Sequence, residues 1–157
     1  MHDEPFFISP PYALQRNKIP AKKPLAVFFE QQHCPGCDEM HLHTLKEPET
    51  QQLMDKFEVV RLNLFGKQPV LTPEGKKSTE AEWARALKVA YTPSIVFFDE
   101  RGKEVFRVEA YLKTFHLQSV LDYAANRAYL TQPSFQRFVK ARGDALREKG
   151  VVIDLWK

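Results

Sequence analysis

The stretch that decides the fold is Leu25-Ala26-Val27-Phe28-Phe29-Glu30, with Cys34-Pro35-Gly36-Cys37 following almost at once. A short, nearly continuous apolar run of this kind is typical of a central strand that is covered on both faces of its sheet. Proline is well tolerated in a first helical turn, where its missing N–H would have no partner. We therefore expect a strand at 25–30, a helix over 37–45, and the two cysteines at the junction between them.

Strand and helix patterns alternate along the rest of the chain. We expect strands at 57–64, 94–98 and 103–108, a loop or small hairpin at 65–78, and helices starting at Thr79 and covering 117–128 and 135–146. Pro48 predicts a helix break or a new first turn. Strands joined by a helical crossover are parallel, and a tight hairpin is antiparallel. The order β–α–β–α–β–β–α therefore predicts an α/β fold with a mixed central sheet flanked by helices.

Composition narrows the class of protein. The 157 residues carry a net charge of +3 with both signs interspersed, whereas a nucleic-acid binder more often carries a basic stripe. No apolar run approaches the roughly 18 residues of a membrane span, and the N-terminus lacks the pattern of a signal peptide.

We expect a monomer with an N-terminal extension at 1–23, a domain at 24–130, and a C-terminal helical extension at 131–157 that packs on the domain and enlarges its core.

The two cysteines are spaced for redox chemistry. The free N–H groups and the dipole of a helix N-terminus stabilise a thiolate at Cys34. Cys37, one turn further on, would resolve the mixed disulfide that Cys34 forms with a substrate protein. A metal chaperone using Cys34, Cys37 and His41 is the alternative from another class. A structural zinc site would need a fourth ligand that the sequence does not provide, so we expect neither a metal nor a cofactor.

This plan, with its CxxC between the first strand and a helix, resembles the thioredoxin fold. Finer similarity to the thioredoxin-like SoxW family runs from residue 24 to the C-terminus. It is carried by these stretches: Phe28-Phe29-Glu30, Cys34 to His41, Arg61 to Leu64, Thr92 to Gly102, Tyr111 to His116, Ser134 to Phe138 and Asp154-Leu155-Trp156. The resemblance implies a periplasmic thiol–disulfide oxidoreductase linked to sulfur-compound oxidation. It also implies a membrane electron donor of the DsbD or CcdA kind.

The resemblance to thioredoxins also implies a substrate-binding surface. The Thr92–Pro93 peptide bond should be cis and lie against the CxxC, with the backbone of Thr92 offered to an extended substrate segment. We expect the substrate to contact five residues around the cysteines: His33, Pro35, Gly36, Thr92 and Pro93.

Thioredoxins bury an aspartate six residues before the nucleophile, where this chain has Phe28. Phenylalanine cannot accept a proton from the resolving thiol. Glu30 lies two residues further along the strand and on the same face, so we expect it to replace the aspartate catalytically. The other interpretation of Glu30 is a strand-end carboxylate that is solvated or paired with Arg61.

The sequence does not determine the direction of electron flow between the protein and its substrates. We favour a reductase, but proline directly after the nucleophile also occurs in oxidising and isomerising relatives, so a disulfide oxidase or isomerase stays open. The periplasmic location follows from the family resemblance, and a cytoplasmic protein is the alternative.

Overall fold

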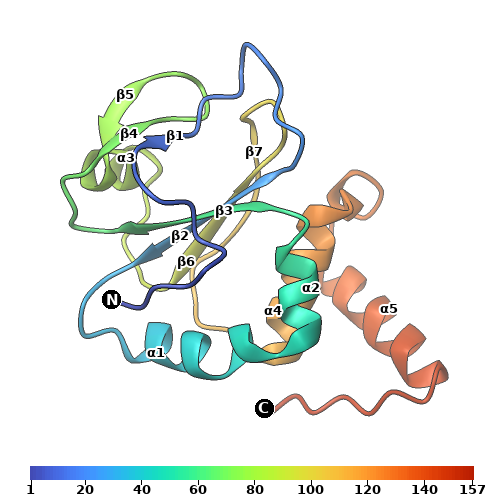
Figure 1. Cartoon of the computed structure of the whole chain (residues 1–157). Coiled ribbons are helices and arrows are strands. Elements are labelled where there is room, and N and C mark those ends of the chain that lie inside the picture. Colours follow the sequence, from blue (N-terminus) through green and yellow to red (C-terminus); the bar gives the residue numbers. More distant parts are fainter.

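A four-stranded mixed sheet forms the centre of the computed structural model, which describes residues 1–157 (Figure 1). Its order is β3 (Glu58–Asn63), β2 (Leu25–Glu30), β6 (Ser94–Phe98) and β7 (Glu104–Val108). All six residues of β2 are buried, as the apolar run predicts. β2 pairs in parallel with β3 and antiparallel with β6, and β6 and β7 form an antiparallel hairpin.

Helices cover both faces of this sheet. On one face lie α1 (Pro35–Leu42), α2 (Pro48–Met54) and α4 (Thr114–Ala125), which pack on Ala26 and Phe28. On the other face Val27 and Phe29 pack beneath α3 (Glu80–Ala86) and a small second sheet of β1 (Tyr12–Ala13), β4 (Pro69–Leu71) and β5 (Lys77–Thr79). The alternation along β2 therefore divides the core into two layers.

Several local predictions are confirmed and some are wrong. A new helix, α2, begins at Pro48, and the predicted hairpin is β4–β5, which spans residues 69–79. Thr79 caps α3, as predicted, and this helix ends at Ala86, shortly before Lys88 adopts a left-handed conformation with φ of 60°. The crossover rule would make β6 parallel, yet β6 runs antiparallel to β2. The segment between β3 and β6 includes a hairpin as well as α3, and it reverses the chain direction.

The N-terminal segment is more deeply integrated than a surface extension. Phe7 bridges to Val59 at the edge of β3, and β1 pairs in parallel with β4. Tyr12 and Leu14 are buried in the core beside β2. Residues before the first central strand thus contribute to both sheets.

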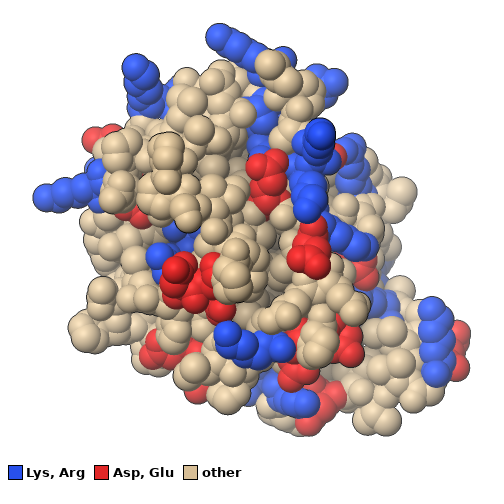
Figure 2. Space-filling view, viewed as in Figure 1, with Lys and Arg blue, Asp and Glu red and all other residues tan.

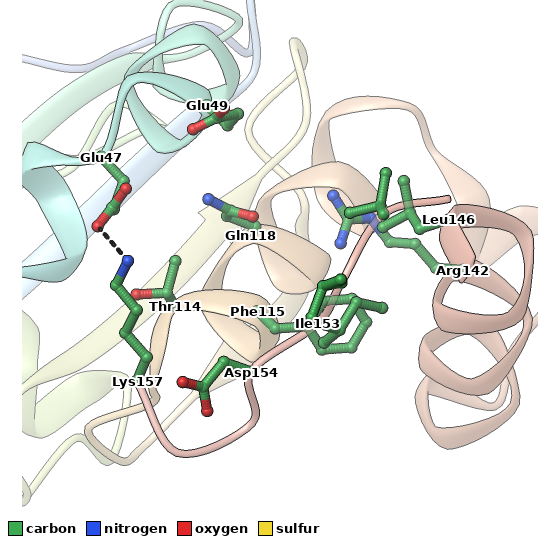
Figure 3. Close-up of a pocket in the computed structure, with 12 residues that line it drawn as sticks. Glu47, Glu49, Thr114, Phe115, Gln118, Arg142, Leu146, Ile153, Asp154 and Lys157 are labelled. Atoms are coloured by element: carbon green, nitrogen blue, oxygen red, sulfur yellow. Dashed lines mark ion pairs between the residues drawn. The ribbon is translucent and has the colours of Figure 1, made fainter. Parts of the chain in front are cut away.

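The C-terminal segment packs only in part. Helix α5 (Phe135–Glu148) docks on α4 through Phe135 and Phe138, whose rings contact Tyr123, and through an Arg142–Asp122 ion pair of 2.9 Å. Beyond α5 the chain turns back over a cavity of about 390 Å³ (Figure 3), where Lys157 pairs with Glu47 at 3.7 Å.

The expectation that the extension enlarges the core is met by Phe135 of α5, which packs against the core, but it is wrong for the apolar residues at the end of the chain. Trp156 is 86% exposed and Leu155 is 44% exposed. The last residues are attached by backbone and charge contacts instead, including a hydrogen bond from the Thr114 N–H to the Lys157 carbonyl.

Charges of both signs alternate over the face of the molecule drawn in Figure 2. None of the helices combines the length and hydrophobicity needed to cross a bilayer.

Candidate active site

Cys34 and Cys37 are joined in a disulfide at the N-terminus of α1, with their Cα atoms 5.2 Å apart. Cys34 is the N-cap of the helix, and its Sγ accepts the backbone N–H of Cys37 at 3.1 Å. Both residues are almost fully buried. The same N–H group and the helix dipole would stabilise a Cys34 thiolate after reduction.

Pro93 lies directly against the CxxC motif. The Thr92–Pro93 peptide bond is cis, as predicted. A Cβ atom added to Gly36 would lie 3.0 Å from Pro93 Cδ and 3.2 Å from Tyr111 Cβ. The absence of a side chain at Gly36 therefore lets the helix N-terminus approach the proline.

The other residues expected to contact substrate surround this junction. His33 and Pro35 are exposed, and His33 adopts a left-handed backbone conformation with φ of 55° just before the nucleophile. Thr92 is buried, and its Oγ1 accepts a hydrogen bond from Gln31 Nε2 at 2.6 Å. The side chain of Thr92 is thus held by the loop that carries His33.

Glu30 faces α1, on the same side of β2 as Phe28, and is 1% exposed. Its two carboxylate oxygens lie 2.8 and 2.9 Å from Nε2 of His41. The solvated interpretation of Glu30 is therefore wrong. So is the pairing with Arg61, whose guanidinium lies 5.5 Å from the centre of the Phe7 ring.

His41 makes a second buried contact, with the N-terminal segment. Its Nδ1 lies 2.8 Å from Glu4 Oε2, and Glu4 Oε1 accepts a hydrogen bond from Lys46 Nζ at 3.1 Å. We call Glu30, His41 and Glu4 the buried triad. Its three members come from β2, α1 and the segment before β1.

The buried triad stabilises charged forms. Burial by itself lowers the pKa of His41, but the hydrogen bonds to Glu30 and then Glu4 outweigh it and raise this pKa above its ordinary value of 6.5. Burial raises the pKa of Glu4, yet the hydrogen bonds from His41 and Lys46 outweigh it and lower this pKa below 4.5. Both shifts favour the charged forms, an imidazolium at His41 and a carboxylate at Glu4.

Glu30 and Cys37 line one cavity of about 360 Å³, together with side chains from the loop between β2 and α1. Cys37 and His41 are four residues apart on α1, so they lie on one helix face a turn apart. The triad is thus adjacent to the buried cysteine.

The sequence alone did not reveal the part that Glu4 plays. The i, i+4 spacing of Cys37 and His41 was visible, but it suggested a metal ligand. In the structure both ring nitrogens of His41 face glutamates, so the imidazole is not directed at the cysteines. Nothing in the local sequence around Glu4 indicates that it reaches a helix 37 residues further along the chain.

Comparisons with known proteins agree with this geometry. The family model of the thioredoxin-like domain matches residues 11–125. A comparison with curated protein sequences found no match.

Among solved structures, a thioredoxin-fold protein from Helicobacter pylori is similar with a TM-score of 0.74 and 17% identity, covering 89% of this chain and 94% of that one. A thioredoxin from Thermus thermophilus has a TM-score of 0.52 and 24% identity over 64% of this chain and 72% of its own. The oxidised C-terminal domain of DsbD from Neisseria meningitidis has a TM-score of 0.51 and 19% identity, covering 65% of this chain and 80% of its own. These likenesses concern the fold. The family match covers most of the chain, so the protein belongs to the family of thioredoxin-like domains.

Proposed function

We propose that the protein is a thiol–disulfide oxidoreductase that exchanges disulfides with protein substrates through Cys34 and Cys37. The observation that carries this proposal is the Cys34–Cys37 disulfide at the N-terminus of α1, where Cys34 is the N-cap and the intervening Gly36 lies against cis-Pro93. It is a redox pair at a helix N-terminus, where a thiolate is stabilised, in a family of thioredoxin-like domains.

In the reducing direction the chemistry has two steps. The Cys34 thiolate attacks a substrate disulfide, which forms a mixed disulfide and releases one substrate thiolate. Cys37 then loses its proton and attacks Cys34 Sγ, which releases the second substrate thiolate and leaves the protein oxidised. Two electrons pass to the substrate, and the released thiolates take up two protons. We propose that Glu30, which shares a cavity with Cys37, accepts the Cys37 proton.

We favour the reductase direction, a periplasmic location, a link to sulfur-compound oxidation and a membrane electron donor of the DsbD or CcdA kind. The support for these is the resemblance of the sequence to the SoxW family. The competing direction, disulfide oxidation or isomerisation, is tested by the reduction potential. A value above about −150 mV, near the strong oxidants of this fold, would reverse the assignment.

Insulin reduction with dithiothreitol as electron source tests the activity. We expect turnover by the natural sequence and none by Cys34→Ser. Cys37→Ser should accumulate mixed disulfides on Cys34 in the source cell, and their identity would name the substrates. A protein without turnover that holds one equivalent of metal tightly when reduced would favour the metal chaperone instead.

A further inference from the structure

The hydrogen bonds of the buried triad require more protons than a neutral imidazole supplies. An ionised carboxylate only accepts hydrogen bonds, and a neutral imidazole donates one. His41 nevertheless contacts a carboxylate with each ring nitrogen. Two such hydrogen bonds need two protons, held as an imidazolium between two carboxylates or as a neutral imidazole beside one carboxylic acid. A proton can move between these forms without the movement of any heavier atom.

The triad runs from the cavity of Cys37 to the protein surface. Its inner end is Glu30, which lines that cavity with Cys37. Its outer end is Glu4, whose side chain is 6% exposed and hydrogen-bonded to Lys46. The Lys46 side chain is 57% exposed. Hydrogen bonds therefore connect Glu30 through His41 to Glu4, beside the surface, where the Lys46 ammonium only donates a hydrogen bond and the proton must leave from Glu4 itself.

Charged and aromatic groups surround His41 on every side. Glu30 faces it from β2, and Glu4 from the N-terminal segment. The ring of His2 stacks on the imidazole with centroids 4.7 Å apart, and His2 Nε2 pairs with Asp38 Oδ1 at 2.7 Å. Phe7 contacts the imidazole edge-on with centroids 5.7 Å apart. These rings shield the triad from water, which strengthens its hydrogen bonds.

We propose that His41 is a positioning residue for disulfide exchange, which together with Glu4 orients Glu30 toward the Cys37 cavity and carries the Cys37 proton onward to the surface. This inference rests on the function proposed above. When Cys37 attacks the mixed disulfide, its S–H proton passes to Glu30. The triad then holds three protons in place of two, and it returns to two when Glu4 releases one to solvent water.

The competing explanation is that the triad only stabilises the fold, as a buried ion pair that would be costly to break. Both explanations predict that variants are less stable. Only the proposed role predicts that the variants differ from the natural sequence in how the rate of the Cys37 step depends on pH. A purely structural group does not take up the thiol proton, so its loss would leave this pH dependence unchanged.

The test separates the two cysteines in time. Reduced protein is mixed with limiting dithiobis(nitrobenzoate) in a stopped-flow spectrometer. Attack by Cys34 releases the first thionitrobenzoate, and attack by Cys37 on the resulting mixed disulfide releases the second. We expect His41→Gln to leave the first phase unchanged. At pH 7 it should slow the second phase by roughly tenfold, less than the ~10²-fold or more that a general base itself supplies.

The difference in second-phase rate between His41→Gln and the natural sequence should shrink as pH rises, because solvent then takes the Cys37 proton directly. Glu4→Gln preserves the shape of the outer residue and should show the same pattern with a smaller loss. It decides the question if His41→Gln does not fold. Glu39→Gln, an exposed change on the same helix, is the matched control and should leave both phases unchanged.

The role of the triad would be overturned if the folded variants showed a second phase with the same rate and the same pH profile as the natural sequence. Absence of a first phase in the natural protein would instead overturn the proposed function. The two failures are therefore distinguishable.

Discussion

Gly36 is the residue at which packing opposes helix propensity most directly. Inside a helix, alanine is favoured over glycine by about 1 kcal/mol. The added methyl group would meet Pro93 Cδ at 3.0 Å and Tyr111 Cβ at 3.2 Å, and overpacking of this kind costs about 1–3 kcal/mol. We expect Gly36→Ala to reduce the free energy of unfolding by about 1 kcal/mol and to slow insulin reduction. Urea denaturation of the oxidised protein measures the first effect.

Gly143 in α5 is the matched control. Its added Cβ would lie 3.2 Å from Nη1 of Arg147, at the flexible end of that side chain, and 3.6 Å from Phe115 Cζ. Helix propensity should then dominate, so Gly143→Ala should stabilise the protein by up to about 1 kcal/mol. If Gly36→Ala were the more stable of the two variants, the close approach of Pro93 would not constrain this position.

His41 predicts how stability depends on pH. Its pKa is raised in the folded protein, so its stabilising contribution is complete below the ordinary value of 6.5 and is lost as pH rises through the raised pKa. We expect the free energy of unfolding of the oxidised protein to fall as pH is increased above 6.5. His41→Gln should be less stable and should lack this part of the dependence. Parallel curves for the two proteins would contradict the prediction.

Glu4 has the opposite sign. Its pKa is lowered, so its contribution is present above the ordinary value of 4.5 and is lost as pH falls through the lowered pKa. The triad therefore stabilises the fold most between these two losses. The free energies of unfolding of Glu4→Gln and the natural sequence, measured by urea denaturation, should become equal as the pH is lowered below 4.5.

At the scale of secondary-structure elements, two helices carry similar caps but differ in their connection to the core. The hydroxyls of Thr79 and Ser134 each accept a backbone N–H in the first turn, for α3 and α5 respectively. Trp83 of α3 is buried in the core, whereas the only buried residue of α5 is Gly143. Loss of the cap of α3 should therefore affect the whole molecule, and loss of the cap of α5 should remain local.

We expect Thr79→Ala to lower the global free energy of unfolding by about 1 kcal/mol. Ser134→Ala should mainly increase amide hydrogen exchange within α5, with a smaller change in the urea midpoint. Hydrogen exchange followed by mass spectrometry on both variants checks this. Equal global losses would show that α5 unfolds together with the central domain.

At the scale of the whole molecule, the two ends of the chain differ in importance. Deleting residues 152–157 removes Val152 and Trp156, which are 92% and 86% exposed, and one backbone hydrogen bond between Thr114 and Lys157. The expected loss of stability is no more than about 1 kcal/mol.

Deleting residues 1–8 removes Glu4, which pairs with Nδ1 of His41, together with Phe7, which bridges to Val59 at the edge of β3. Breaking a buried ion pair typically costs about 3–5 kcal/mol, so this truncation should be far more damaging than the C-terminal one. Urea denaturation of both truncated proteins measures the difference. A larger loss from the C-terminal deletion would contradict the structure's account of the two ends.

The sequence by itself determined the features that arise from neighbouring residues. The apolar run of β2, the proline at the start of α1, the Thr79 cap and the CxxC spacing all act over a few positions, where steric and hydrogen-bonding preferences operate directly. They were sufficient for the mixed sheet and for the junction that carries Cys34 and Cys37, whereas the cis bond at Pro93 followed only from the resemblance to thioredoxins. They also placed Glu30 on the correct face of β2, since side chains alternate along a strand.

Only the tertiary structure decided what Glu30 contacts. Its partner His41 lies on the following helix, and Glu4 arrives from a segment that crosses the sheet edge before β1. Such contacts depend on how whole elements pack, and no local preference encodes them. The same reason explains why β6 proved antiparallel and why Trp156 stayed exposed: topology, not the hydrophobicity of one segment, determines which surfaces are available for burial.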